Sequence, residues 1–348
     1  MRRRFGVFSL KKLHILIVLV VILIVVFFFV AYKLLYNWEF SDDHTTSASQ
    51  PKETLAADSA LEERPMISYN GGWYALREDL ETLLLLGVDK YEKELSDQTV
   101  YRNQQQTDFV MLLVMDKKQN SYTAIHLNRD TMTKIPILSV NGMVVGYENA
   151  QLTLAHTYGS GGADSCRNSV RAVSEFLYGI DVKHYIALTM DAVAVLNDAV
   201  GGVTVTLEDD FSFLDPEMTA GKTVTLKGNE ALAYVRARGE MEDSSNLARM
   251  KRQQTYLYAL YGALQSKAGT DSEFLLETIV KISEHMVSDC TVEQLNDIAE
   301  LTKNSEFLGI ENTPGEAMKG ERFMEFYADD NALSELVIEL FYEPIALN

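Results

Sequence analysis

The hydrophobic and polar positions of this chain divide it into three stretches with different patterns. Residues 15–32 form an apolar run without a charged side chain. A helix rises about 1.5 Å per residue, so a helical run of this length is just long enough to cross a bilayer core of about 30 Å. Residues 41–64 are rich in Ser, Thr, Asp and Glu and cannot bury enough surface to fold. We predict a tail at 1–12, a transmembrane helix at 13–36, a flexible stalk at 37–65 and a folded region from residue 66 onward.

The charges around the apolar run predict its orientation. Five basic residues precede it and only Lys33 follows it before the sequence turns acidic; the five are Arg2, Arg3, Arg4, Lys11 and Lys12. Positive charge stays on the cytoplasmic side, so the folded region is expected outside the cytoplasm. A cleaved signal peptide would have a shorter apolar core and a small-residue cleavage site. The run continues instead into Leu34 and Leu35, so we predict an uncleaved signal anchor and a single-pass membrane protein.

Strand-like and helix-like segments alternate in the folded region, which predicts an α/β domain with helices layered on a sheet. Residues 82–88 are predicted to be a strand buried on both faces, and 109–115 and 121–127 a hairpin. Further strands are predicted at 184–188 and 203–207. Ser165 and Asp191 are predicted to cap helices that end at Gly179 and Gly201. The remaining predicted helices are 244–266, 273–286, 292–302 and 332–341, so we expect a main domain at 66–270 and a helical C-terminal extension at 271–348.

Charge and cysteine content narrow the possible functions. The net charge is −19, with 31 basic against 50 acidic residues, which disfavours bulk binding to nucleic acid or anionic lipid. An anionic ligand would need a local basic cluster. The two cysteines, Cys166 and Cys290, could form a disulfide outside the cytoplasm, but the sequence does not decide whether they do.

The predicted hairpin brings two charged residues together. If its turn centres between Lys118 and Gln119, Asp108 and Arg129 lie equally far from that centre and face each other across the open end. Asp89 follows the buried strand and is expected at the same rim, where α/β sheets bind ligands. The three residues fit either a ligand site or an ordinary ion pair beside a capping aspartate.

Two arginines lie in the run from Tyr234 to Arg238. Interpreted as a strand, this run places Arg236 and Arg238 on one face without an intervening acid. Guanidinium groups match phosphate oxygens bidentately, so a pyrophosphate is a suitable partner, although solvent could also screen the two charges.

The helix predicted at 244–266 carries a separate polar face. Leu247, Met250 and Leu257 belong to its predicted apolar stripe, whereas Arg249, Arg252 and Gln253 fall elsewhere without an acid among them. This polar face could be solvated or could meet a ligand.

Other chemistries find little support in the sequence. A Walker-type phosphate loop, an H-E-x-x-H motif, paired C-x-x-C motifs and a G-x-S-x-G elbow are all missing. The run 159–162 (GSGG) is interpreted as a turn or mobile loop. None of the six histidines pairs with a second one at metal-ligand spacing.

Several separated motifs together resemble the LytR-CpsA-Psr family. They occur in the family's order and rough spacing over about residues 80–265, which is the extent of the likeness. The motifs are LLLLGVD (83–89), TDF (107–109), NRDT (128–131), NA (149–150), LKGNEALAYVRAR (226–238), Arg249 and RQQ (252–254).

The resemblance implies an α/β/α domain that binds a polyprenyl pyrophosphate and, with Mg²⁺, transfers a phosphorylated glycopolymer such as teichoic acid or capsule from undecaprenyl pyrophosphate to peptidoglycan. Asp89 and Asp108 match the family's metal-associated aspartates. The matches to its pyrophosphate-binding side chains are Arg129, Arg236, Arg238, Arg249 and Gln253, to which we add the neighbouring Arg252. The candidate catalytic residues are Asp89, Asp108, Arg129, Arg236 and Arg238.

The chain departs from the family pattern in three places, which leaves its substrate open. Gln106 replaces an arginine, Asn128 replaces a proline, and a lysine-rich stretch before Asn149 is missing. We therefore predict a glycopolymer phosphotransferase. A polyprenyl-pyrophosphate phosphatase and a non-catalytic, lipid-sensing envelope regulator are the alternatives. Either Asp89 or Asp108 could accept the proton of an attacking sugar hydroxyl.

Overall fold

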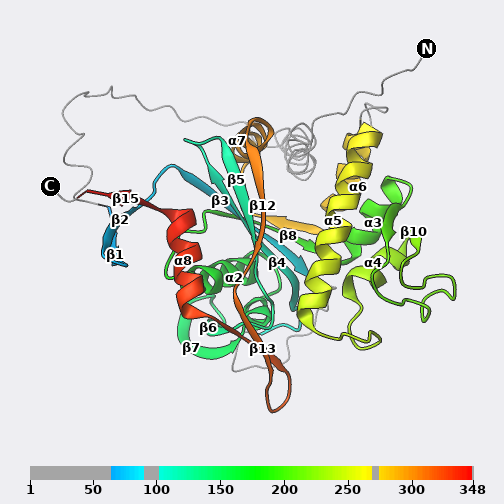
Figure 1. Cartoon of the computed structure of the whole chain (residues 1–348), viewed down its shortest axis with the longest axis horizontal. Coiled ribbons are helices and arrows are strands. Elements are labelled where there is room, and N and C mark those ends of the chain that lie inside the picture. The colour runs from blue at the N-terminus through cyan, green and yellow to red at the C-terminus, as the bar shows by residue number, and fades with distance from the viewer. Residues whose placement is uncertain (1–63, 90–101, 269–273, 347–348) are drawn as a thin grey trace.

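The computed structural model describes residues 64–89, 102–268 and 274–346 (Figure 1). The predicted tail, the predicted transmembrane helix and most of the predicted stalk lie outside these residues. Within them, no helix is both long and apolar enough to span a membrane. The last two stalk positions contact the folded domain, because Arg64 pairs with Glu343 at 2.7 Å and Pro65 accepts a hydrogen bond from the Leu76 amide.

A six-stranded mixed sheet forms the centre of the domain, in the order β11-β8-β3-β4-β5-β12. Strand β3 is antiparallel to β4 and parallel to β8, and β4 is antiparallel to β5. The outer strands are β12, parallel to β5, and β11, antiparallel to β8. Their bounds are β3 Leu80–Val88, β4 Thr107–Asp116, β5 Ser121–His126, β8 His184–Thr189, β11 Met286–Ser288 and β12 Glu306–Asn312.

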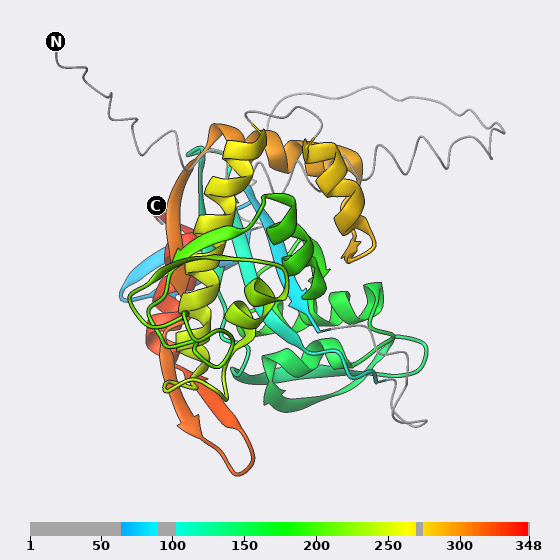
Figure 2. The same cartoon turned by 90° about the vertical axis from the view of Figure 1, so that its right-hand side faces the viewer.

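Helices cover both faces of this sheet, so the predicted α/β/α layering is confirmed (Figures 1 and 2). One face packs against α2 (Ala163–Phe176), α8 (Asp330–Phe341) and the short 3-10 helix η1 (Leu152–Thr157). The other faces α3 (Asp191–Ala199), α5 (Asn246–Ala268), α6 (Phe274–Ser283) and α7 (Val292–Asn304).

Alternation along the strands explains why both faces are buried. On β3 and β4, Leu84 and Leu112 point into the core under α2, whereas Leu83 and Leu113 point into the opposite core. A strand between two helical layers needs apolar residues at successive positions, which is the pattern of TLLLLGV.

Four smaller sheets complete the domain. The strands β1 (Met66–Tyr69), β2 (Gly72–Leu76) and β15 (Tyr342–Ile345) form one sheet that joins the two ends of the described chain. The other three are hairpin-like pairs: β6 (Met132–Leu138) with β7 (Val144–Gln151), β9 (Val203–Thr206) with β10 (Thr223–Leu226), and β13 (Gly315–Lys319) with β14 (Met324–Ala328).

Four sequence predictions about local structure are wrong. Asp191 does not cap a helix, because it is the first residue of α3 and the N-cap is Met190, without a side-chain capping bond. The run from Tyr234 to Arg238 is not a strand, because α4 (Asn229–Arg236) includes its first three residues. Ser165 does not cap α2, which begins at Ala163 after Gly162. The C-terminal region is not a helical extension, since β12 belongs to the central sheet and β11, β13, β14 and β15 also follow residue 271.

The remaining local predictions fare better. The strands expected at 82–88, 184–188 and 203–207 and the hairpin are confirmed. The run GSGG forms the bends that lead into α2. Both cysteines are buried and unpaired.

Candidate functional site

Asp108, the second residue of β4, is the centre of an arginine cluster. Its Oδ1 accepts from Arg129 Nη1 and from Arg249 Nη1, the latter at 3.0 Å, and its Oδ2 lies 3.4 Å from Arg236 Nε. Arg129 comes from the end of the β4–β5 hairpin, whose observed register is the predicted one, with Met111 opposite His126 and Asp116 opposite Ser121. Asp108 and Arg129 therefore meet where the hairpin register places them.

Asp89 lies beside Asp108, directly after β3. Arg236 Nη2 donates to Asp89 Oδ1 at 2.6 Å, and the Asp89 backbone amide donates to the Gln106 carbonyl at 2.9 Å. Burial and the neighbouring Asp108 carboxylate raise the pKa of Asp89 to about 6. A carboxyl group with that pKa can gain and lose a proton close to neutral pH, as a general base or acid must.

Asp108 remains ionised although it is buried. Burial alone would raise its pKa, but Arg129 and Arg249 outweigh that effect and hold the pKa below its usual value. Arg249 is itself only 4% exposed, and burial lowers its pKa to about 10 against the opposing effect of Asp108. The two aspartates thus have different proton affinities, although they lie in one site.

The end of α4 directs two further arginines toward the site. Tyr234 and Val235 are buried against the core under α5, and the backbone becomes extended at Ala237. Arg236 therefore reaches Asp89, while Arg238 reaches Asp130, with its Nη2 2.8 Å from Oδ2. The two arginines approach one site because the helix ends between them, not because they share a strand face.

Helix α5 contributes Arg249 and Gln253 from a buried face. Gln253 Nε2 donates to the carbonyls of Asp108 and Val235, both at 3.3 Å, and its Oε1 is buried without a hydrogen-bond partner. Arg252, predicted with this group, instead pairs with Asp209 at 3.1 Å and donates to the Ala237 carbonyl. The predicted apolar stripe of the helix also needs correction, since Leu247 is 43% exposed.

Two residues of the site, Asp130 and Asn246, had no role in the sequence prediction. Asp130 pairs with Arg238 and is buried. Asn246 accepts from Arg249 Nη2 and donates to Asn128 Oδ1 at 2.7 Å, so it holds Arg249 against the hairpin end. The position of Asp130 directly after Arg129 was a sequence signal for its place in the site. Asn246 had no such signal, because it comes from a distant helix.

Gln106 explains how the chain accommodates one departure from the family pattern. Its Oε1 accepts from Arg129 Nη2. An arginine at this position would place a second cation against Arg129, whereas the glutamine oxygen satisfies one of its donors.

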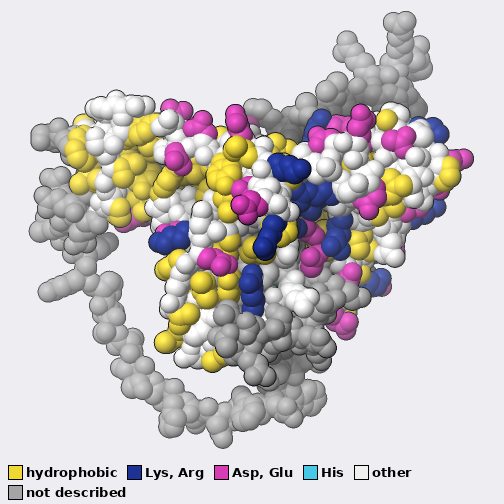
Figure 3. Space-filling view, turned by 90° about the horizontal axis from the view of Figure 1, so that it is seen from below, with side chains coloured by type: hydrophobic (Ala, Val, Ile, Leu, Met, Phe, Trp, Pro, Cys, Tyr) yellow, Lys and Arg dark blue, Asp and Glu magenta, His cyan; other side chains and the backbone are white. Residues whose placement is uncertain are grey.

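Among the residues of the site that the structure describes, positive charge exceeds negative charge. Four guanidinium groups (Arg129, Arg236, Arg238 and Arg249) meet three carboxylates (Asp89, Asp108 and Asp130). Arg236, the most exposed of the four, has 42% of its side chain accessible. The face of the molecule seen from below shows Lys and Arg side chains gathered near its middle, beside Asp and Glu (Figure 3). Such a site attracts a multivalent anion.

An apolar cavity of about 220 Å³ lies between the central sheet and helices α3, α5 and α6. The sheet supplies side chains such as Met111, Leu113 and Ile186, and α5 supplies Leu257 and Leu260. The lining is almost wholly apolar, which suits a hydrocarbon ligand.

One end of the cavity meets the arginine cluster. Its lining includes Gly87, Phe109 and Gln253, and the first two are close in sequence to Asp89 and Asp108. A Cβ atom at Gly87 would lie 2.9 Å from Phe109 Cβ and 3.0 Å from Met190 Sδ, so only glycine allows this packing without a shift. A ligand with an apolar tail and an anionic head could occupy the cavity and the cluster together.

The pair of aspartates also fits a magnesium ion. Mg²⁺ prefers oxygen ligands and is usually held by one or two carboxylates together with substrate phosphates and water. Asp89 and Asp108 supply two adjacent carboxylates, and burial together with the Asp108 charge raises the pKa of Asp89, so a bound cation would stabilise its ionised form. These two residues would hold the ion.

The fold and the site thus define a class of protein: an α/β/α domain in which an apolar cavity opens at a cluster of arginines and aspartates. The chain belongs to the LytR_cpsA_psr family, whose model matches residues 40–336. A relative in Bacillus mycoides, a polyisoprenyl-teichoic acid–peptidoglycan teichoic acid transferase named TagU, is 26% identical over 262 residues, or 74% of this chain and 77% of TagU. A TagU of Enterococcus faecalis is 26% identical over 218 residues, which are 63% of this chain and 64% of that TagU.

Solved structures share the fold. TagT bound to LI-WTA superposes with a TM-score of 0.54 at 22% identity, covering 76% of this chain and 90% of TagT. The protein gbs0355 from Streptococcus agalactiae gives a TM-score of 0.59 at 20% identity, covering 75% and 86%. The match of the family model over residues 40–336 confirms the family resemblance inferred from the motifs.

Proposed function

We propose that this protein transfers a phosphorylated glycopolymer from undecaprenyl pyrophosphate to peptidoglycan. The observation that carries the proposal is the direct contact between the apolar cavity and the arginine–aspartate cluster through Gly87, Phe109 and Gln253. The names of the TagU relatives support the same reaction class. The pattern of the site suits a substrate whose pyrophosphate joins a lipid to a sugar.

In this proposal the polyprenyl tail occupies the cavity. Its apolar lining, from Leu85 at the sheet to Leu264 on α5, replaces water around the isoprene units. The cavity of about 220 Å³ holds only part of a long polyprenyl chain, so the remainder stays in the membrane. The apolar run at 15–32 and the basic residues before it support a membrane-anchored chain with this domain outside the cytoplasm.

The arginines bind the pyrophosphate. Arg236 is the most exposed of the four and can exchange its partner Asp89 for a phosphate oxygen, and a proton or Mg²⁺ would then neutralise Asp89. Arg129 and Arg249 are held in place by Asp108, so their guanidinium groups are already oriented when the substrate arrives. This preorganisation stabilises the charge that develops on the phosphate oxygens during transfer.

The proposed reaction is a phosphoryl transfer in which one bond to phosphorus forms as another breaks. An acceptor sugar hydroxyl on peptidoglycan attacks the phosphorus bonded to the glycopolymer, and the bond from that phosphorus to the bridging oxygen breaks. The lipid leaves as a monophosphate, and a new phosphodiester joins the polymer to peptidoglycan. We assign Asp89 as the group that accepts the hydroxyl proton, because its pKa of about 6 leaves it ionised but basic at neutral pH.

A magnesium ion held by Asp89 and Asp108 would supply additional neutralisation of the pyrophosphate charge. With or without this ion, the arginines bind and orient the phosphates. Gln253 holds the end of β4 against α4 through its two carbonyl contacts and thereby fixes the boundary between cavity and cluster.

The proposal is tested with the purified full-length chain in lipid nanodiscs, given undecaprenyl-pyrophosphate glycan labelled in its sugars, Mg²⁺ and peptidoglycan fragments. Label on peptidoglycan with an equal amount of lipid monophosphate is the expected result. Lipid monophosphate with the label left in solution would instead identify a phosphatase that uses water as acceptor.

A variant that lacks both Arg236 and Arg238 separates an enzyme from a regulator. Replacement of both by alanine should abolish transfer, because two of the four cationic groups disappear. Transfer at the level of the unchanged protein would exclude the assignment of Arg236 and Arg238 to pyrophosphate binding. Tight binding of the lipid by the unchanged protein, with no turnover, would support a non-catalytic regulator instead.

A further inference from the structure

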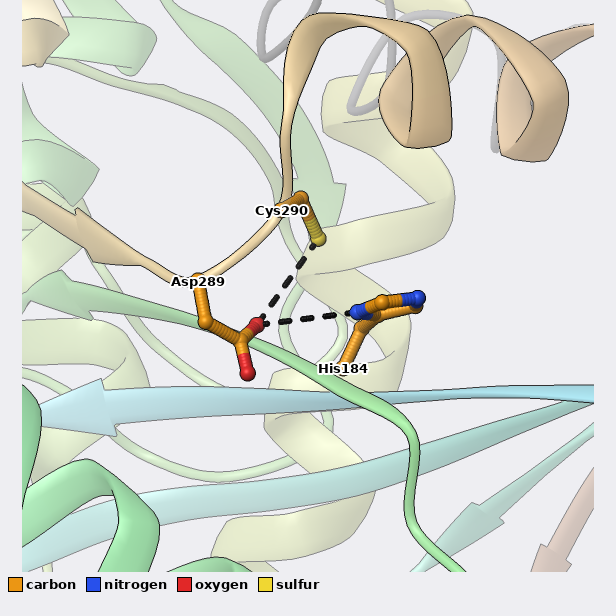
Figure 4. Close-up of side chains that lie close together, drawn as sticks. All are labelled: His184, Asp289 and Cys290. Carbon is orange, nitrogen blue, oxygen red and sulfur yellow. Dashed lines mark hydrogen bonds and ion pairs between the residues drawn. The ribbon is translucent and has the colours of Figure 1, made fainter. Parts of the chain in front are cut away.

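Three potential metal ligands meet at the far end of β8 from the arginine cluster (Figure 4). His184 begins β8, and Asp289 and Cys290 follow β11. The β8–β11 register pairs Ser288 with Ile186, and two further steps along each strand place Cys290 opposite His184. Residues about a hundred positions apart in the chain are thus brought together by the antiparallel pairing at the edge of the sheet, which a search for local spacing does not detect.

The distances among the three side chains suit a transition-metal ion. Asp289 Oδ1 lies 3.8 Å from His184 Nδ1 and 4.0 Å from Cys290 Sγ, and one atom from each residue lies within 4.8 Å of the other two. Zinc–ligand bonds of about 2.0–2.3 Å require about 3.3–3.7 Å between neighbouring ligands of a tetrahedron. Small side-chain rotations therefore suffice to form the site.

The surroundings hold two of these ligands in place. The Tyr185 amide donates to Asp289 Oδ1 at 2.9 Å. Ser288 Oγ accepts from the Cys290 amide at 3.1 Å and donates to the Tyr185 carbonyl at 2.9 Å. The connection from β11 to α7 is thereby held against β8 before any ion binds, which reduces the ordering that binding requires.

A second, independent observation concerns the other nitrogen of His184. Its Nε2 faces Glu81 Oε1 at 3.7 Å, and Glu81 is held by Lys117 at 2.6 Å. A histidine that binds a metal through one ring nitrogen commonly directs the other to a carboxylate, which fixes the tautomer and the ring orientation. Glu81 is placed to accept from Nε2 while Nδ1 faces Asp289 and Cys290.

We propose that His184, Asp289 and Cys290 form a Zn²⁺ site that fastens the connection between β11 and α7 to the edge of the central sheet. The ligand set of one imidazole, one thiolate and one carboxylate suits zinc and does not suit Mg²⁺, which prefers oxygen alone. Asp289 is solvent-exposed and provides the entry path, and water completes the coordination.

The site is structural and separate from the arginine cluster. Along β3, His184 is opposite Leu83 and Thr189 is opposite Val88, which is next to Asp89. Five strand residues separate the two ends by about 16 Å. Zinc binding should therefore change stability and leave the reaction itself unaltered.

The purified full-length chain, stripped of metal with a chelator, provides the test. Addition of Co²⁺ as a probe should produce a thiolate-to-cobalt charge-transfer absorption with one ion per chain, and Zn²⁺ should displace it. With Mg²⁺ kept saturating throughout, so that Asp89 and Asp108 are already occupied, added Zn²⁺ should raise the melting temperature by several degrees.

Matched variants assign the site. His184→Gln, Asp289→Asn and Cys290→Ser should each weaken Zn²⁺ binding at least tenfold, and Cys290→Ser should remove the thiolate absorption. Cys166→Ser changes the other buried cysteine and should retain both signals. If Cys290→Ser does not fold, the His184 and Asp289 variants still decide the question. Absence of the cobalt absorption in the unchanged protein, or its persistence at full strength in His184→Gln, would overturn the proposal.

Discussion

Asp108 at the start of β4 and Arg129 beyond the end of β5 form an ion pair across the open end of the hairpin. The same carboxylate also pairs with Arg236 and Arg249, so one buried group compensates three cations from different parts of the chain. Removal of a partner from a buried ion pair leaves an unpaired charge and destabilises a protein by about 3–5 kcal/mol. Loss of the Asp108 carboxylate should therefore destabilise the fold as well as disturb the proposed site.

Asp108→Asn should destabilise the folded domain by about 3–5 kcal/mol and abolish transfer. Asp116 provides a matched control, because it lies at the opposite end of β4 and pairs with Arg77. Asp116→Asn should also lower the free energy of unfolding but preserve transfer per folded molecule. Urea unfolding measures the first quantity and the transfer assay the second. Equal loss of activity in both variants would show that Asp108 acts only through stability.

The pKa of Asp89 predicts the pH dependence of the reaction. Because Asp89 must be ionised to accept a proton, kcat/KM at subsaturating Mg²⁺ should be nearly constant above about pH 6 and fall about tenfold per pH unit below it. Saturating Mg²⁺, held by the same carboxylate, should move this fall to lower pH. The measurement is kcat/KM for the lipid substrate across this range at one fixed Mg²⁺ concentration. A profile without a decrease at acidic pH, with the protein still folded, would exclude Asp89 as the base.

The same raised pKa predicts a small effect on stability. Folded Asp89 binds a proton more tightly than the unfolded residue does, so its contribution to stability is present below the ordinary pKa of about 3.9 and is lost as pH rises through about 6. Asp89→Asn cannot ionise and should become more stable relative to the unchanged protein across this window. The comparison of urea midpoints at both ends of the window measures the difference. A difference between the two proteins that is independent of pH would contradict the assigned pKa.

The cavity predicts a dependence on the length of the lipid. Ala124 on β5 lines the cavity and is 2% exposed, so Ala124→Phe should fill part of its volume. The variant should raise KM for an undecaprenyl substrate about tenfold and leave KM for a geranyl substrate nearly unchanged. The geranyl substrate is the internal control for a folded, active site. An equal rise of KM for both substrates would show that the variant disturbs the arginine cluster instead.

Gln106 predicts the effect of restoring the arginine typical of the family. Gln106→Arg removes the acceptor for Arg129 Nη2 and adds a fifth cation to the site. The free protein should become less stable by about 1 kcal/mol, and its affinity for inorganic pyrophosphate should increase, with a stronger dependence on salt. Thermal unfolding and calorimetric titration test both effects. Unchanged affinity would place Gln106 outside the reach of the phosphates.

The sequence allowed some of this site to be predicted because parts of it depend on local geometry. Hairpin register is set by the turn, so the Asp108–Arg129 pair followed from counting residues. Arg236 and Arg238 were predicted to lie together for a wrong reason. The end of a helix directs them toward the site, not a shared strand face.

The parts that could not be predicted depend on packing between distant elements. Asn246 reaches Asn128 only because α5 crosses the end of the hairpin, and the cavity exists because α3, α5 and α6 leave space above the sheet. The position of β12 next to β5 is of the same kind, because a parallel strand from the far end of the chain has no local signal.

The central claim is that the protein breaks the bond between the two phosphates and moves the phosphate on the sugar side. The most direct test uses undecaprenyl-pyrophosphate glycan with ³²P in that phosphate and follows where the label goes. Our account predicts that ³²P appears on peptidoglycan as a phosphodiester, with unlabelled undecaprenyl monophosphate as the second product. Retention of ³²P in undecaprenyl pyrophosphate while the sugar moves to peptidoglycan would contradict it, because the reaction would then be glycosyl transfer.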